Sequence, residues 1–513
     1  MNLLSLEKQY CKVIIIIIQY FFVTLHPVMM ILLTVIVYFV VLMVISRFTS
    51  GGADNATFYL ARRRAPWYMV AFGMIGASIS GVTFISVPGM VLTSQMTYLQ
   101  MCLGFIVGYA VIAFVLLPLY YRLQLTSIYT YLGQRLGDRS YQTGAWFFLL
   151  SKMVGASVRF YVVCIILQQF VFDPAGIPFV VNVMGMVLLI WLYTRRGGIG
   201  TLVFTDTFQT LCLFTALVLI ILEATSQLHL SVGEAVNAIS NSEMSRIFVF
   251  DDWVSPHNFW KQFLSGAFIA IVMTGLDQDM MQKNLTCKSL KDAQKDMCTY
   301  GIAFVPANLL FLALGVLLAL LAGNTTGLKG DELLPNFVQG ITVQSSMFNV
   351  QWPQLLLTIG IVAASFSSAD SALTSLTTSF CVDIRRQPDN EQLRKRMHVV
   401  MCLVFVLFIL LFRAINSTSL IDAVYILASY TYGPLLGLFT FGLFTRRKPM
   451  DRLVPYICIA SPLLCYALDN AAQHFLDYRF GYELLMLNGL LTFAGLWLSS
   501  KMTTTGDPQM EQR

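Results

Sequence analysis

Long apolar stretches recur along this 513-residue chain and restrict what it can fold into. A membrane-spanning helix needs about 20 predominantly apolar residues. Stretches of that length begin near residues 28, 66, 98, 140, 177, 198, 260, 298, 352, 397, 419, 453 and 480. The sequence therefore predicts an all-α integral membrane protein with about thirteen transmembrane helices, whose surroundings are a lipid bilayer.

The composition excludes several other classes of protein. Charged residues make up 12% of the chain, whereas a soluble domain typically carries about 25%. The net charge of +6 is scattered between apolar stretches rather than gathered in one patch, so no nucleic-acid partner is predicted. The cysteines and histidines form no metal-binding pattern, and no nucleophile–base pair is evident. We therefore expect no enzyme activity, no cofactor and no protein partner.

Basic residues alternate strictly between the two sets of connecting segments. One set holds 24 Lys and Arg, including Lys283, Lys288, Lys291 and Lys295 in one loop, and the other set holds five. Loops rich in Lys and Arg face the cytoplasm. We therefore expect a multi-pass protein of the cell membrane (plasma or inner), with the helix at residue 28 starting outside and the C-terminus in the cytoplasm. Residues 1–27 are expected to be an N-terminal extension; an additional interfacial or spanning helix is the alternative.

The second apolar stretch is rich in glycine and hydroxyl groups. Gly76, Ala77, Ser78, Ser80 and Gly81 cluster near its middle. Such a helix can unwind and expose carbonyl groups to a cation. Close packing of helices through small residues is the alternative interpretation.

The ninth stretch places several oxygen-bearing side chains at membrane depth. Ala364, Ser367, Ser368 and Ser371 share one helix face, and Asp370 borders it. Oxygen ligands suit a hard cation such as sodium, and a carboxylate at this depth is costly without a partner. A seam of interhelical hydrogen bonds is the alternative.

Further polar residues interrupt other stretches. Asp206 is either a second carboxylate for a buried cation or a group near a helix end. Lys152 and Arg159 share a helix face, where they can pair with Asp370 or Asp206, meet an anionic solute, or form a structural ion pair. The Gly433-Pro434 pair predicts a break or hinge in the eleventh stretch.

Together these segments resemble the sodium/solute symporter family, in particular its monocarboxylate, sialic acid and multivitamin members. The resemblance covers roughly residues 28–500, and its carriers are the segments 78–89, 127–137, 198–209, 277–279, 363–378 and 432–434. The family implies a LeuT-type fold, in which two inverted five-helix repeats form the core. The chain would then divide into a leading helix (28–48), two repeats (66–226 and 258–446), two trailing helices (451–500) and a cytoplasmic tail (501–513).

The resemblance also implies two sodium sites. A first site would use the carbonyls of Gly76, Ile79 and Ala364 with the hydroxyls of Ser367 and Ser368. A second would use Asp206, Ser367, Asp370 and Ser371. The family has a hydroxyl where this chain has Asp370, which either strengthens cation binding or indicates that the carboxyl is protonated.

The expected function is secondary active import of a small polar solute by sodium symport through alternating access. Sodium is the expected coupling ion and the only expected metal. Arg159 favours a carboxylate-bearing solute, which would bind near Ser78, Val82 and Thr83, and the expected hinges are Gly81, Gly433 and Pro434. A channel or a membrane sensor built on the transporter fold remains the alternative.

Overall fold

The computed structural model describes residues 27–51, 54–253, 255–323, 330–341, 352–415, 420–476, 478 and 480–501. The N-terminal extension and most of the expected tail lie outside these residues. The first half contains α2 (Pro27–Thr49), α3 (Asn55–Leu60), α4 (Trp67–Ser78), α5 (Gly81–Ser94), α6 (Tyr98–Val111), α7 (Leu117–Arg122), α8 (Thr130–Arg135), α9 (Asp138–Leu167), α10 (Phe179–Gly197), α11 (Ile199–Gln227) and α12 (Val232–Ser240). The second half contains α13 (Phe259–Ala270), α14 (Gln278–Asn284), α15 (Leu290–Ala322), α16 (Gly330–Ile341), α17 (Trp352–Ser379), α18 (Glu391–Ile415), α19 (Leu420–Phe444), α20 (Val454–Leu476) and α21 (Leu484–Leu498).

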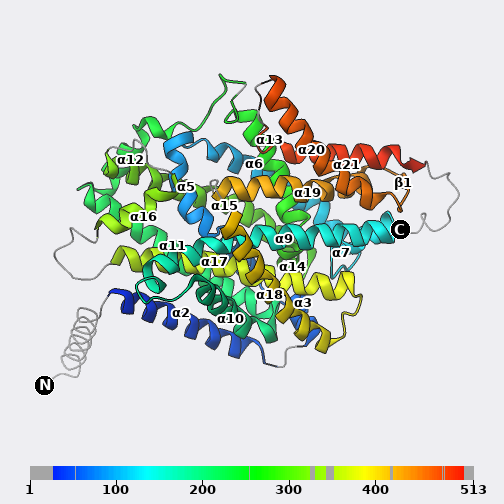
Figure 1. The fold of residues 1–513 in the computed structure, drawn as a ribbon, viewed down its shortest axis with the longest axis horizontal. Helices are drawn as coiled ribbons and strands as arrows, with labels where there is room; N and C mark the ends of the chain where they lie inside the picture. The colour runs from blue at the N-terminus through cyan, green and yellow to red at the C-terminus, as the bar shows by residue number, and fades with distance from the viewer. Residues whose placement is uncertain are drawn as a thin grey trace.

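Short helical turns and two strands complete the described chain. The turns are η1 (Ala61–Arg63), η2 (Ile112–Leu116), η3 (Gln168–Phe172), η4 (Glu243–Ser245), η5 (Ile271–Gly275) and η6 (Phe380–Ile384). The strands β1 (Lys448–Pro449) and β2 (Ser500–Lys501) pair in an antiparallel arrangement. Figure 1 shows most long helices running side by side along the longest axis, with α12 and α16 at one end and β1 at the other.

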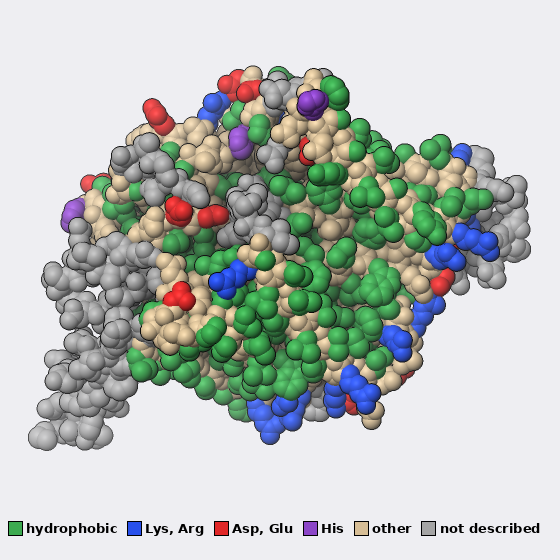
Figure 2. Space-filling view, in the orientation of Figure 1, with side chains coloured by type: hydrophobic (Ala, Val, Ile, Leu, Met, Phe, Trp, Pro, Cys, Tyr) green, Lys and Arg blue, Asp and Glu red, His purple; other side chains and the backbone are tan. Residues whose placement is uncertain are grey.

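Nine helices of the described residues are long and apolar enough to cross a membrane, and two bent helix pairs raise this number to eleven. The two further spans expected from the sequence fall on α20 and α21, of which α21 has only 15 residues. The outer surface suits lipid, because apolar side chains cover the middle of the molecule in Figure 2. In this view most Lys and Arg lie along the lower edge and at the end that carries β1.

The first bent pair is α4 and α5, which meet at an angle of 62°. Between them Ile79 and Ser80 are extended, with ψ angles of 93° and 173°, so the helix stops after Ser78 and restarts at Gly81. Gly81 allows a close approach there, because a Cβ would lie 2.2 Å from the hydroxyl oxygen of Ser365 on α17. The expected unwinding of the second apolar stretch is therefore present.

The second bent pair is α13 with η5 and then α14, and its angle is 71°. Asp277 caps α14, because its side chain accepts hydrogen bonds from the amides of Asp279 and Met280. This bend corrects the prediction that Lys283 lies in a cytoplasmic loop. Lys283 belongs to α14 and is buried. Each expected repeat range thus begins with a bent helix, at α4/α5 and at α13/α14.

The eleventh apolar stretch forms α19, which runs without interruption through Gly433 and Pro434. Proline has no N–H and cannot bond the carbonyl four residues earlier. Asn488 on α21 supplies the missing donor, since its Nδ2 lies 3.1 Å from the Tyr430 carbonyl and 2.9 Å from that of Ser429. The break expected at Gly433-Pro434 is therefore absent from this structure.

Candidate functional site

The break between α4 and α5 faces the serine-rich part of α17. The Ser368 hydroxyl donates to the Ala77 carbonyl at 2.8 Å and to the Ala364 carbonyl at 3.2 Å. Carbonyls in the last turn of a helix lack intrahelical partners, so the end of α4 presents oxygen atoms toward α17. The fully buried Ile79 lies at the break. Oxygen atoms from two helices therefore meet here in surroundings that suit a hard cation.

The five residues expected to form the first sodium site do not all converge on the break. Ser367 is turned toward α11, where its hydroxyl donates to Asp206 Oδ1 at 2.8 Å. Gly76 packs directly against α11, because a Cβ would lie 1.9 Å from the Thr210 hydroxyl oxygen. Close helix packing through small residues therefore accompanies the unwound segment.

The four residues expected to form the second sodium site do lie together. Asp206 is bonded to Ser367, while Asp370 accepts hydrogen bonds from Tyr193 at 2.7 Å and Ser371 at 3.2 Å. A fifth group, Lys283 of α14, enters this cluster, with its Nζ 2.8 Å from Asp206 Oδ2.

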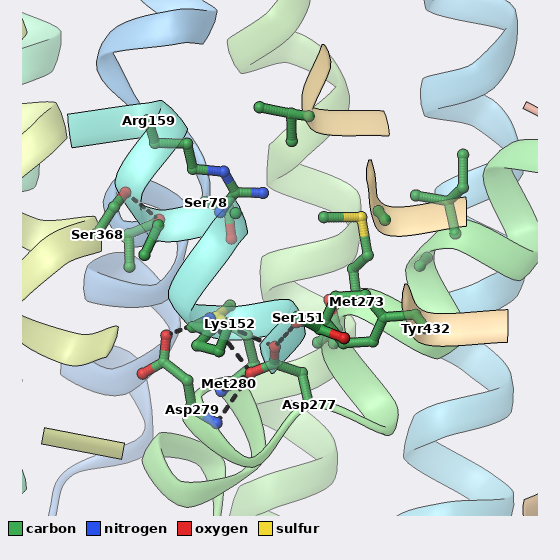
Figure 3. A pocket seen from close by; sticks show the side chains of 18 of the residues that line it. Ser78, Ser151, Lys152, Arg159, Met273, Asp277, Asp279, Met280, Ser368 and Tyr432 are labelled. Carbon is green, nitrogen blue, oxygen red and sulfur yellow. Dashed lines mark hydrogen bonds and ion pairs between the residues drawn. The ribbon is translucent and has the colours of Figure 1, made fainter. Parts of the chain in front are cut away.

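A cavity of about 90 Å³ lies beside the break and is lined by α4, α9, the α13–α14 bend and α19. Two of the four expected solute residues, Ser78 and Arg159, line it, whereas Val82 and Thr83 are not among its lining residues. The Ser78 hydroxyl lies 2.6 Å from that of Tyr300, which is also in the lining. Figure 3 shows Arg159 on α9 directed into the cavity, near Ser78 and Ser368.

Lys152 lies two helical turns before Arg159 on α9 and is neutralised within the protein (Figure 3). Its Nζ is 2.6 Å from Asp279 Oδ2 and 3.3 Å from Asp277 Oδ1. Asp277 also accepts a 2.5 Å hydrogen bond from Tyr432 of α19. Lys152 therefore pairs with the α14 carboxylates, and the suggested pairing with Asp206 or Asp370 is wrong. All four residues of this network line the cavity.

Sequence reasoning missed the part played by α14. In the sequence, Asp277 and Asp279 stand out only through the family resemblance and Lys283 only as a loop residue, although all three are buried in the structure. The length of the segment is the one available signal, because 259–275 contains 17 residues and spans about 25 Å as a helix, less than the hydrocarbon core of about 30 Å. A second helical piece was needed to complete that span, and α14 provides it.

Known proteins resemble this chain over most of its length. The sequence profile of the Sodium:solute symporter family matches residues 58–450. The sodium/sialic acid symporter NanT of Aliivibrio fischeri is 27% identical over 454 residues, which cover 85% of this chain and 87% of the relative. The sodium/sialic acid symporter SiaT of Proteus mirabilis is 24% identical over 482 residues, covering 88% and 91% respectively.

The fold also matches a solved structure. An outward-open, substrate-bound structure of a Na⁺-coupled sialic acid symporter superposes with a TM-score of 0.75 at 19% identity, covering 92% of this chain and 99% of that one. This match confirms the expected LeuT-type fold. The family profile covers more than half of the chain and describes transporters, not enzymes. The chain is a multi-pass, sodium-coupled solute symporter, and it belongs to the Sodium:solute symporter family.

Proposed function

We propose that this symporter imports a small carboxylate-bearing solute across the cell membrane by alternating access. The observation that carries the proposal is the state of Arg159. It is half-buried in the cavity wall and has no ion pair among the residues described, whereas Lys152 in the same wall is fully paired. A guanidinium group presents a planar fork that binds a carboxylate through two parallel hydrogen bonds.

The names of the related transporters also favour a solute that carries a carboxylate. The NanT and SiaT symporters are named for sialic acid, which carries a carboxylate. Aromatic side chains, including Tyr300 and Tyr425, line the rest of the cavity, as is usual for pockets that enclose a small organic solute. A carboxylate at Arg159 would also lie close to the Ser78 hydroxyl.

Sodium is proposed to bind where the α4–α5 break faces Ala364 and Ser368. The contributing groups are the carbonyls near Gly76 and Ile79, the Ala364 carbonyl and the Ser368 hydroxyl, with Ser367 able to join after rotation. An ion held between α4 and α17 stabilises one arrangement of these helices. The solute cavity begins at the same break, so each ligand favours the binding of the other.

Two sets of contacts beside the cavity are proposed to act as barriers toward the two ends of the molecule. The hydroxyls of Tyr98 and Tyr425 lie 3.0 Å apart on one side, which is outside in the proposed orientation. The network of Lys152, Asp277 and Tyr432 lies on the cytoplasmic side. Alternating access would open these barriers in turn, with bending at Gly81.

Replacing Arg159 with Gln tests the solute assignment. The variant should lose sodium-driven uptake of its carboxylate solute, because the fork that binds the carboxylate is gone. Arg159→Lys should recover only part of the uptake, since an ammonium group cannot form the two parallel bonds. Uptake is measured in proteoliposomes with an inward sodium gradient, using labelled sialic acid and short monocarboxylates as probes.

Arg452→Gln serves as the matched control, because Arg452 is exposed, follows β1 by three residues and is not among the residues that line the cavity. Sodium-induced thermal stabilisation should persist in Arg159→Gln, which shows that the ion site is intact. Unchanged carboxylate uptake in that variant would rule out the carboxylate assignment. Uptake that is independent of the sodium gradient in the native protein would rule out the symport mechanism.

A further inference from the structure

Lys283 is a buried cation inside the cluster that the family resemblance assigns to a second sodium ion. Its side chain is 3% exposed, and its Nζ lies 2.8 Å from Asp206 Oδ2, whose own side chain is 2% exposed. The two residues come from α14 and α11, so the pair links the second bent helix to the first repeat.

Every carboxylate oxygen of this cluster already has a partner. Asp206 Oδ1 accepts a hydrogen bond from the Ser367 hydroxyl, and Asp206 Oδ2 forms an ion pair with the Lys283 ammonium. Asp370 Oδ1 and Oδ2 receive the hydroxyls of Ser371 and Tyr193. Of these partners only the Lys283 ammonium carries a positive charge, and its Nζ lies beside Asp206 Oδ2, where a coordinated cation would have to sit.

The charge beside Asp206 leads to the same conclusion for this carboxylate. A buried carboxylate is strongly destabilising unless a cation or hydrogen bonds compensate it. Lys283 is the only cation paired with Asp206 in the described part of the chain, because Lys152 is engaged by Asp277 and Asp279. A sodium ion at Asp206 would have to lie beside the ammonium group, where like charges repel in a medium of low dielectric constant.

We propose that the Lys283 ammonium is a built-in cation that takes the place of a second sodium ion, so that each transport cycle carries one sodium ion. This inference rests on the proposed sodium site at the α4–α5 break. The ammonium group holds α14 against α11 and α17, as a bound ion would, but it stays with the protein.

The number of sodium ions bound by the purified full-length protein in lipid nanodiscs tests the proposal. Equilibrium binding of radioactive sodium should give one ion per native protein. Lys283→Ala removes the ammonium and leaves space beside Asp206, so this variant should bind two. Lys283→Met fills the space without a charge, and it should bind no second ion. Lys288→Ala removes an exposed lysine five residues away and should bind one ion, like the native protein.

Three results would overturn the proposal. Two ions bound by the native protein would show that Lys283 does not replace one. A single ion bound by folded Lys283→Ala would show that the cluster is not a cation site. No ion bound by the native protein would refute the underlying sodium site as well. If Lys283→Ala does not fold, Lys283→Ala combined with Asp206→Asn removes both charges, and this variant should bind one ion; two would again overturn the proposal.

Discussion

Ser367 and Ser368 are adjacent on α17, yet their hydroxyl groups serve different partners. Ser367 bonds to Asp206 of α11, and Ser368 bonds to the end of α4. Successive residues of a helix point about 100° apart, so one pair of serines connects α17 to two neighbouring helices. The proposed sodium site at the break and the cluster around Asp206 are therefore separated by a single residue step.

Because Ser368 faces the break and Ser367 faces α11, replacing Ser368 should weaken sodium binding at the break more than replacing Ser367. Ser368→Ala should weaken sodium binding on the order of tenfold, because a lost ligand worth about 1.4 kcal/mol corresponds to that factor. The sodium concentration at the midpoint of thermal stabilisation measures the effect. Ser375→Ala is the control, since the buried Ser375 hydroxyl bonds only to the Ala372 carbonyl of its own helix. Equal midpoints for the two variants would contradict the assignment.

At the scale of elements, α19 depends on a side chain from another helix for its continuity through Pro434. Asn488 also accepts a hydrogen bond from Ser461 of α20 at 2.6 Å, so it joins three helices. A carbonyl that loses its donor in an apolar interior is costly. The fold thus replaces the backbone donor that Pro434 removes with an amide from α21.

Asn488→Ala should accordingly destabilise the protein by about 1–3 kcal/mol, the usual cost of leaving a buried hydrogen-bonding group unsatisfied. A denaturant or thermal unfolding series in detergent measures the loss. Asn470→Ala provides the comparison, because the exposed Asn470 amide bonds only to the Tyr466 carbonyl within α20. Matching stabilities of the two variants would show that Asn488 does not compensate for Pro434.

The two bent pairs also show how far the sequence could be interpreted. The first break was predictable because Gly76 and Gly81 lie in one apolar stretch and weaken helical continuity locally. The second break is not evident from the sequence, because Asp277 and Lys283 are charged and resemble loop residues. Their burial depends on Lys152 and Asp206, which lie 125 and 77 positions away in the chain. Long-range charge pairing of this kind is invisible to local pattern analysis.

At the scale of the whole molecule, the distribution of basic residues predicts which end faces the cytoplasm. Ser240 is the last residue of α12, at one end of the fold in Figure 1, and Lys288 belongs to an expected cytoplasmic loop; both are exposed. In a Cys11→Ser background, Ser240→Cys should react with an impermeant maleimide in intact cells. Lys288→Cys should react only after permeabilisation. None of the nine cysteines described is exposed, so the background labelling should be low. The reverse labelling pattern would invert the proposed orientation.

The burial of Lys283 has an energetic consequence for the cell. A tethered ammonium returns with the protein in every cycle, so it contributes no net movement of charge. One sodium ion entering with a singly charged anion is then electroneutral. The membrane voltage, worth about 2.3 kcal/mol per charge at 100 mV, would add nothing to accumulation. Uptake would depend on the difference in sodium concentration alone, and it would continue in a depolarised cell for as long as that difference lasts.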